Sequence, residues 1–150
     1  MPPITCHILD TTRGKPASDV IVAIYKIGEV PNSSNSELII QESSDPFGLA
    51  RTNQDGRITD WNFHPSKDLT NLGIDSKLQK WNELKSGIYK IRFQTRDYFK
   101  RLSEINDDSN SGRTFFPFVE IIFTVDNPPD NHYHIPLLLS NHSYTTYRGS

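Results

Sequence analysis

Short strand-like apolar runs recur along the chain, polar turns separate them, and helical periodicity is scarce. Residues 4–9 are rich in β-branched side chains, and residues 20–25 are almost continuously apolar, which is typical of a strand covered on both faces. Apolar and polar side chains alternate from Ile88 onwards, which predicts a half-exposed strand over residues 87–95. Further strands are expected at residues 38–40, 115–125, 132–140 and 143–147.

Helical spacing is confined to two segments. A short helix is expected over residues 97–102, with Asp97 as its cap. One or two helical turns are expected within residues 65–86, where three apolar side chains recur about a turn apart, namely Leu78, Trp81 and Leu84. Pro136 has no N–H, so its strand is expected at a sheet edge or a bulge. About seven or eight short strands with few helices predict an all-β fold, an antiparallel β-sandwich.

Composition narrows the class of protein. A chain of 150 residues suits one domain over residues 1–150 and can bury a core without metal or disulfide staples. The 16 Lys+Arg and 18 Asp+Glu give a net charge of −2, which argues against nucleic acid and anionic membranes as partners. Cys6 is the single cysteine, so no internal disulfide can form, and it is expected in the core.

The chain carries no apolar run of the ~20 residues that span a bilayer. Its first residues do not resemble a secretory signal peptide, and its last three are not a Ser-Lys-Leu type peroxisomal address. A cytoplasmic location is therefore expected, with a peroxisomal one as the alternative.

The histidines are the first candidates for chemistry because they titrate near neutral pH. His7 lies between Cys6 and Ile8, so its side chain points away from the face that those two share. His132 and His134 are two positions apart on one predicted strand and project to the same face. A lone histidine is most often a surface or hydrogen-bonded core residue, but a same-face pair is an unusual choice for a plain core.

Other chemistries are less well supported. A His-x-His pair with His7 offers three zinc ligands, but no cysteine pair or placed acid supplies a fourth, so no metal is expected. The chain has no Gly-x-Ser-x-Gly elbow and no phosphate-binding glycine loop. Arg57 follows a turn over residues 53–56, in which Gly56 can adopt a positive φ. Metal-free acid–base catalysis is the favoured chemistry.

Three separated motifs resemble a known family. They are His7-Ile8-Leu9-Asp10-Thr11-Thr12-Arg13-Gly14-Lys15-Pro16-Ala17, then Thr52-Asn53-Gln54-Asp55-Gly56-Arg57, and Tyr133-His134-Ile135-Pro136-Leu137-Leu138-Leu139-Ser140 with the terminal Tyr147-Arg148-Gly149-Ser150. Together, and in this order, they resemble the 5-hydroxyisourate hydrolases, enzymatic relatives of the hormone carrier transthyretin. The similarity runs from His7 to Ser150 but is poor over residues 31–49 and 65–86, which are expected to enlarge loops. Two departures, Asn141-His142-Ser143 and Thr145, touch none of the residues carried over but lie near the expected pocket.

The resemblance implies hydrolysis of 5-hydroxyisourate, a small-molecule substrate, to 2-oxo-4-hydroxy-4-carboxy-5-ureidoimidazoline in urate degradation, without a cofactor. It implies a transthyretin-like sandwich of two four-stranded sheets with one short helix, and a homotetramer with active sites at the dimer–dimer interface. The catalytic residues that it implies are His7, Arg57, His134 and Ser150. The substrate-binding residues that it implies are Tyr147, Arg148, Gly149 and His132.

Two other functions remain open at this point. The first is a transthyretin-like carrier of a small aromatic ligand, and the second is a sandwich used only for protein interaction. The carrier lacks the terminal Tyr-Arg-Gly-Ser and the two histidines, which favours the enzyme. Within the enzyme, either His7 or His134 would deprotonate water while the other orients water or protonates the departing nitrogen, and the sequence leaves that choice open.

Overall fold

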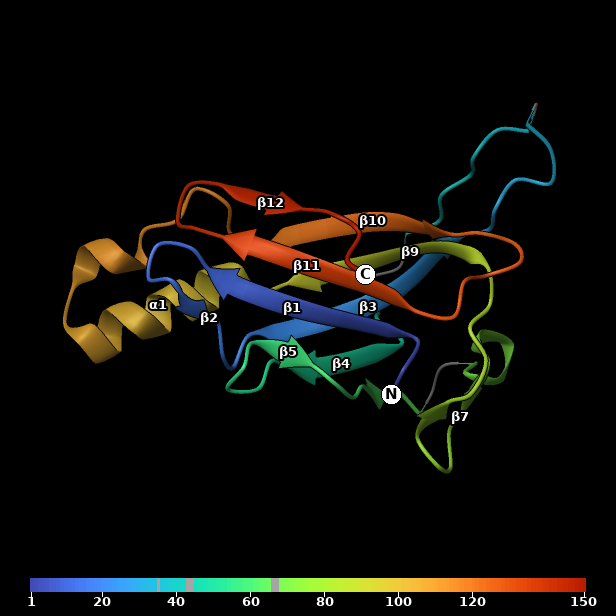
Figure 1. The fold of residues 1–150 in the computed structure, drawn as a ribbon, viewed down its shortest axis with the longest axis horizontal. Coiled ribbons are helices and arrows are strands. Elements are labelled where there is room, and N and C mark those ends of the chain that lie inside the picture. Colours follow the sequence, from blue (N-terminus) through green and yellow to red (C-terminus); the bar gives the residue numbers. More distant parts are fainter. Residues whose placement is uncertain (35, 43–44, 66–67) are drawn as a thin grey trace.

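The computed structural model describes residues 1–34, 36–42, 45–65 and 68–150. Two sheets pack face to face in it, which confirms the predicted sandwich (Figure 1). We call them the front sheet and the back sheet, as they lie in Figure 1. The front sheet has the order β12-β11-β1-β2, and β5 also pairs with β1. Its strands are β1 (Ile4–Asp10), β2 (Lys15–Pro16), β5 (Arg57–Ile58), β11 (Tyr133–Leu139) and β12 (Tyr144–Thr146).

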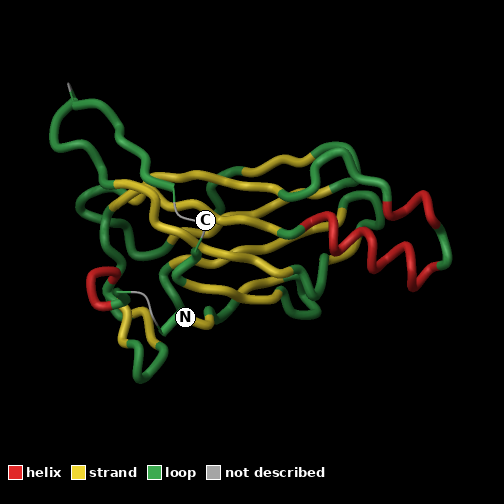
Figure 2. The backbone as a smooth tube through the Cα atoms, turned by 180° about the vertical axis from the view of Figure 1, so that it is seen from behind, coloured by secondary structure: helices red, strands yellow, loops and turns green. Residues whose placement is uncertain are grey.

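The back sheet has the order β10-β9-β3-β4-β6 and is seen from behind in Figure 2. Its strands are β3 (Ile21–Gly28), β4 (Gly48–Arg51), β6 (Asn62–Phe63), β9 (Gly87–Phe93) and β10 (Val119–Val125). Each sheet has five strands, because short pieces such as β2 and β6 extend the four that were expected. The front sheet is also not purely antiparallel, since β1 and β11 run parallel.

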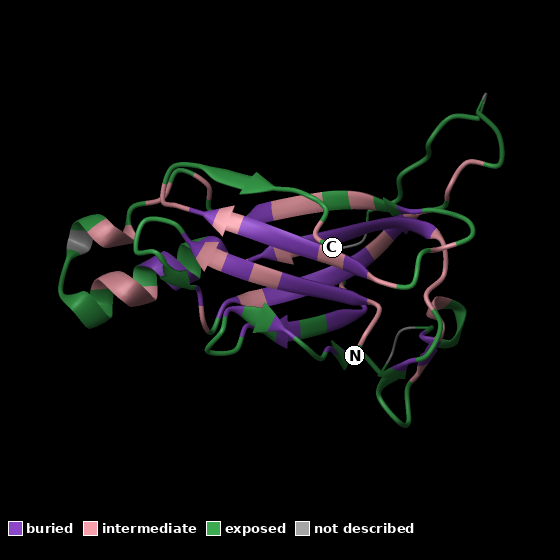
Figure 3. Ribbon diagram, in the orientation of Figure 1, coloured by how far each residue is buried: buried purple, intermediate pink, exposed green. Residues whose placement is uncertain are grey.

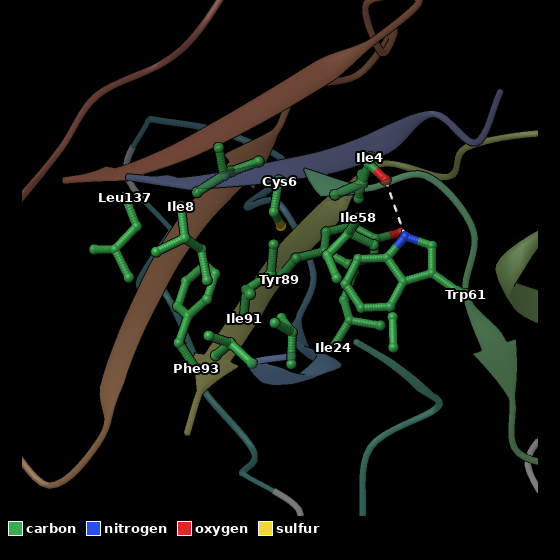
Figure 4. Packing of buried hydrophobic residues seen from close by; sticks show 14 of the residues in the cluster. Ile4, Cys6, Ile8, Ile24, Ile58, Trp61, Tyr89, Ile91, Phe93 and Leu137 are labelled. Atoms are coloured by element: carbon green, nitrogen blue, oxygen red, sulfur yellow. Dashed lines mark hydrogen bonds between the residues drawn. The ribbon is translucent and has the colours of Figure 1, made fainter. Parts of the chain in front are cut away.

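The core fills the space between the two sheets. Alternate residues of β1, namely Ile4, Cys6 and Ile8, point inward and are fully buried. They face Ile91 and Phe93 of β9, and the Trp61 indole N–H donates to the Ile4 carbonyl at 2.9 Å (Figure 4). Cys6 is therefore a core residue, as predicted, and burial raises the pKa of its thiol. Because the even positions of β1 fill the core, its odd positions lie on the outer face of the front sheet.

Helix α1 (Thr95–Asn106) covers one end of the sandwich and confirms the predicted helix, which is longer than expected at both ends (Figure 1). The predicted cap is wrong: Gln94 is the N-cap, and Asp97 lies in the first turn. Two short 3-10 helices, η1 (Thr70–Leu72) and η2 (Ser109–Gly112), complete the helical content of the described residues.

The helical turns predicted around Leu78, Trp81 and Leu84 are wrong. Only η1 is helical in the described part of residues 65–86, and the following chain forms a hairpin of β7 (Ile74–Asp75) and β8 (Lys80–Trp81). The Trp81 ring packs edge-to-face on Phe47 and Phe63, and its indole N–H donates to the Leu72 carbonyl at 3.1 Å. The spacing of these residues reflects contacts of a loop with the core, not a helix.

The prediction that β9 is half exposed is also wrong. Ile88 and Lys90, on its outer face, are 3% and 5% exposed. The burial colouring of Figure 3 shows that most of the long strands of the sandwich are buried. Ile88 joins a second small cluster with Ala23, Tyr25 and Ile27. The Lys90 ammonium lies over the Tyr25 ring and pairs with Glu42 and Glu120 at 3.4 and 3.2 Å. Residues of the loop before β4 thus help to cover the outer face of the back sheet.

Strand β11 is not an edge strand, although Pro136 predicted one, because it lies between β1 and β12. The Pro136 carbonyl accepts from the Thr146 hydroxyl at 2.7 Å, on the side of β12. The missing N–H of Pro136 faces the same side, and the pairing of β12 begins only at Leu137. Proline is tolerated here because the ladder has ended.

The strand predicted at residues 38–40 is reduced to a single bridge between Gly28 and Ile40. Strand β10 begins at Val119, four residues later than predicted, and β12 confirms the last predicted strand. No helix of the described residues is long and apolar enough to span a membrane.

Candidate active site

Three of the four predicted catalytic side chains, those of His7, Arg57 and His134, come from three strands of the front sheet and share its outer face. His7 of β1 pairs in register with Arg57 of β5, and Thr5 of β1 pairs with His134 of β11. Cross-strand partners point to the same side of a sheet, so Thr5, His7, Arg57 and His134 form one surface. The rings of His7 and His134 stack with centroids 6.5 Å apart and planes inclined at 29°.

One hydroxyl group joins His134 of β11 to His132, which directly precedes that strand. Thr5 Oγ1 lies 2.8 Å from His134 Nδ1 and 3.0 Å from His132 Nε2. The His132 and His134 rings stack at 6.3 Å, as expected for residues two apart on a strand. Both histidines are half-buried, whereas Thr5 is buried. The sequence did not point to Thr5, because threonine does not titrate near neutral pH and this residue belongs to none of the three motifs.

His7 is oriented by the turn that carries Arg57. The backbone carbonyl of Asp55 hydrogen-bonds to the His7 ring. A carbonyl only accepts, so the His7 nitrogen that meets it must carry the proton, and the other nitrogen is unprotonated when the ring is neutral. This is the form of histidine that a general base requires.

The turn itself is held by Asn53. Its side-chain oxygen accepts from the N–H groups of Asp55 and Arg57 at 2.9 and 3.1 Å. Gly56 has φ of 73°, as the sequence predicted, and a Cβ there would lie 2.4 Å from the Ile8 carbonyl oxygen. The turn therefore packs tightly on β1 and fixes Arg57 at the start of β5.

Both candidate histidines favour the neutral form. Burial lowers the pKa of His7, and the positive charge of Arg57 lowers it further. Burial also lowers the pKa of His134, followed by the charges of Arg57, His132 and His7. At neutral pH the surface thus offers two uncharged imidazoles beside a permanent cation, which suits proton transfer next to a developing negative charge.

The C-terminal segment returns to the same surface. The Gly149 N–H donates to the His134 carbonyl at 2.8 Å, and the two residues form a bridge. A Cβ on Gly149 would lie 2.6 Å from His134 Cδ2, so glycine is needed for this approach. Ser150 follows directly and is exposed, which brings the chain end next to His134.

The other two predicted tail residues, Tyr147 and Arg148, lie on the side of His134 that faces β10. The Arg148 guanidinium lies over the Tyr133 ring and pairs with Asp130 at 2.8 Å. Tyr147 is exposed and, with Arg148, His134 and residues of β10, lines a cleft of about 260 Å³. The structure thus brings His7, Arg57, His132, His134 and Gly149 together, while Arg148 anchors the tail beside them.

Metal ligands are not grouped in this way. Among the residues that the structure describes, no three His, Cys, Asp or Glu side chains are placed to hold one ion.

The chain is similar to proteins of one family throughout its length. A model of the HIUase/Transthyretin family matches residues 4–149. A probable 5-hydroxyisourate hydrolase of Schizosaccharomyces pombe is 38% identical, with 99% of this chain and 92% of that protein covered. The 5-hydroxyisourate hydrolase of Halalkalibacterium halodurans is 35% identical, with 98% of this chain and 97% of that protein covered.

Solved structures share the fold. The 5-hydroxyisourate hydrolase of Klebsiella pneumoniae superposes with a TM-score of 0.59 at 24% identity, covering 100% of this chain and 94% of that one. Transthyretin from Sparus aurata superposes with a TM-score of 0.63 at 20% identity, covering 99% and 97%. These likenesses confirm a transthyretin-like, mostly β fold with two main sheets and one helix, and the fold is common to the hydrolase and the carrier.

Proposed function

The chain belongs to the HIUase/transthyretin family, and we propose that it is a hydrolase that opens the ring of 5-hydroxyisourate with water in urate degradation, giving 2-oxo-4-hydroxy-4-carboxy-5-ureidoimidazoline. The observation that carries this proposal is the pairing of His7 and His134 beside Arg57 on one open sheet face. The relatives that match the whole chain are named as hydrolases of this substrate.

His7 is the base in this proposal. The N–H of its imidazole donates a hydrogen bond to the Asp55 carbonyl, so the other imidazole nitrogen carries no proton. That nitrogen takes a proton from water as the water oxygen attacks the carbonyl of the substrate ring. Arg57 donates to the oxygen that becomes negative, where its planar fork can make two parallel bonds. His134 then protonates the departing nitrogen as the C–N bond breaks.

The tail completes the substrate site. Ser150 and its carboxylate would position water or substrate, and Gly149 sets their distance from His134. Tyr147, Arg148 and His132 would line the substrate-binding edge. For Arg148 this role means holding the tail, because its guanidinium is paired with Asp130.

We further propose that the active form is a homotetramer, with the sites between dimers. The outer face of the front sheet leaves His7 and His134 only half-buried, so a single chain does not enclose them. Reaction in an enclosed site would exclude bulk water and strengthen the effect of Arg57 on the developing oxyanion. A second copy packed on this face supplies that enclosure.

The activity is tested by generating 5-hydroxyisourate from urate with urate oxidase and following its decay by absorbance. We expect this protein to accelerate the decay well beyond the spontaneous rate, with turnover. A carrier of small aromatic ligands would bind in the same fold without turnover. Decay at the spontaneous rate in the presence of the folded protein would therefore reject the hydrolase and favour the carrier.

A further inference from the structure

The Thr5 hydroxyl has one proton and two imidazole neighbours. Its oxygen is within hydrogen-bond distance of His134 Nδ1 and His132 Nε2, and the residue is only 6% exposed. A hydroxyl donates one bond and accepts others, so Thr5 can give its proton to only one of the two rings. When Thr5 donates to one imidazole, the other imidazole must therefore donate its N–H to the Thr5 oxygen.

This arrangement couples the tautomers of two histidines. If Thr5 donates to His134 Nδ1, His134 carries its proton on Nε2, and His132 donates its own Nε2 proton to Thr5. If Thr5 donates to His132 instead, His134 carries its proton on Nδ1 and presents a bare Nε2. In both cases Nδ1 of His134 is occupied by Thr5, so Nε2 is the nitrogen left for the substrate.

The first arrangement fits the roles of the two catalytic histidines. In the proposed mechanism His7, which donates a hydrogen bond to the Asp55 carbonyl, is the base, and this leaves the acid role to His134. An acid needs a proton on Nε2, and this is the form in which Thr5 donates to Nδ1. His132 is half-buried at the end of the row, so it can exchange protons with solvent.

We propose that His132, Thr5 and His134 form a proton relay that supplies His134 with a proton at Nδ1 as its Nε2 proton leaves, so that the ring stays neutral, with Thr5 as a positioning residue. The inference rests on the proposed hydrolase function. As the C–N bond breaks, the Nε2 proton of His134 passes to the departing nitrogen, which takes the bonding electron pair. The Thr5 proton moves to His134 Nδ1, the His132 Nε2 proton moves to Thr5, and His132 takes a proton from water at Nδ1. The hydroxide left by that water is neutralised by the proton that His7 took from the attacking water. The relay then resets: His134 regains a proton from water at Nε2, its Nδ1 proton returns through Thr5 to His132 Nε2, and the His132 Nδ1 proton passes back to the solvent.

The direct test is ¹⁵N NMR of the histidine-labelled protein without substrate, at a mildly alkaline pH where the rings are neutral. We expect His134 and His132 both to be protonated on Nε2. Thr5→Val removes the hydroxyl at nearly constant shape and should release the His134 tautomer to a mixture, whereas Thr5→Ser should keep it. His134 protonated on Nδ1 in the wild type, or an unchanged tautomer in Thr5→Val, would overturn the relay.

Kinetics supply a second readout. Thr5 is not expected to touch the substrate, so Thr5→Val should lower kcat about 10- to 100-fold, the effect typical of removing a partner that orients a reactive histidine, with KM little changed. Thr5→Ser should restore kcat. An unchanged kcat in a folded Thr5→Val protein would also reject the relay. If the wild type does not hydrolyse 5-hydroxyisourate at all, the proposed function fails, while the NMR arm still decides the tautomers.

Discussion

Arg57 acts on two histidines at once. It is the cross-strand partner of His7, and its charge lowers the pKa of both His7 and His134 in addition to the effect of burial. In the proposed mechanism the cation that stabilises the oxyanion thus also favours the uncharged form of the two histidines beforehand. The side chain therefore links the charge of the site to its proton chemistry.

Replacing Arg57 by Gln should raise the pKa values of His7 and His134 towards the ordinary histidine value of 6.5, because the repulsive charge is lost while burial remains. In the wild type, both rings should stay neutral to a lower pH than in the variant. NMR titration of the two rings measures this. Arg51→Gln, on the exposed side of β4, is the matched control and should leave both titrations unchanged.

The same pKa values predict how the stability of the fold depends on pH. The unfolded chain binds protons at its histidines near pH 6.5, where the folded rings of His7 and His134 still resist protonation. The free energy of unfolding should therefore decrease as the pH falls below 6.5. Above pH 6.5 these two histidines should make no difference to it, because they are neutral in both the folded and the unfolded chain. In the Arg57→Gln variant this decrease should be smaller.

Gly149→Ala tests whether the tail must touch His134. The new Cβ would lie 2.6 Å from His134 Cδ2, so either the ring or the chain end must move. A displacement of about 1 Å in a catalytic group can cost about 10²-fold in rate, and we expect a loss of kcat of that order with the fold retained. Full activity in a folded Gly149→Ala protein would show that Ser150 has no fixed place near His134.

At this scale the sequence motifs predicted which side chains meet, and the structure brings His7, Arg57 and His134 together. They did not predict what orients them. Thr5 has no motif of its own, and the Asp55 group that contacts His7 is a backbone carbonyl, which no residue pattern reveals. Contacts between strands far apart in the chain become visible only with the sheet register.

Among the elements, α1 is linked to the front sheet by a buried hydrogen bond between Tyr98 and Asp10. The Tyr98 hydroxyl donates to Asp10 Oδ2 at 2.7 Å, and Asp10 Oδ1 accepts from the Arg13 N–H at 3.0 Å. Both Tyr98 and Asp10 are buried, and burial together with this bond raises the pKa of the Tyr98 phenol. The pair holds the helix where β1 ends.

Tyr98→Phe should destabilise the protein by about 1–3 kcal/mol, because a buried carboxylate oxygen loses its partner. Urea denaturation measures the free energy of unfolding. Tyr144→Phe removes a hydroxyl from exposed β12 and should change the free energy by less than about 0.5 kcal/mol. Equal effects of the two substitutions would contradict a specific role for the Asp10 bond.

The sequence predicted strands correctly where a short run of apolar and β-branched residues stands between polar turns, as in β1 and β3. It failed where tertiary contacts override the local pattern. Trp81 and Leu84 recur at helical spacing, yet Trp81 belongs to a hairpin that packs on Phe47. The outer face of β9 reads as exposed, yet Tyr25 and Glu42 cover Lys90. Neither partner lies near these residues in the sequence.

For the whole molecule, the two sheets have edge strands on the same side, β10 in the back sheet and β12 in the front sheet. Exposed apolar side chains lie on or next to these strands, including Ile122, Phe118 and Tyr144. An open strand edge with apolar side chains favours pairing with another copy. We infer that this edge is a second contact surface of the proposed tetramer, besides the outer face of the front sheet that carries the sites.

Ile122→Lys should therefore weaken the assembly, because a charge would be buried where two edges pair. Sedimentation should show a lower mass than the wild type, and activity should fall with it if the sites lie between copies as proposed. Leu38→Lys replaces an equally exposed apolar residue on the loop before β4 and should change neither. A wild-type protein that is monomeric and fully active would contradict the proposed tetramer.

The measurement that tests the account most directly is the rate of 5-hydroxyisourate hydrolysis by three histidine variants. His7→Asn and His134→Asn should each lower kcat/KM by about 10²- to 10⁴-fold, the range for losing one proton-transfer group, while circular dichroism shows the fold unchanged. The sequence placed His142 near the expected pocket, but this exposed histidine between β11 and β12 lines a surface with Arg96 and Phe115 instead, so His142→Asn should match the wild type. Wild-type rates in either His7→Asn or His134→Asn would remove that residue from the chemistry and contradict a catalytic centre on the front sheet.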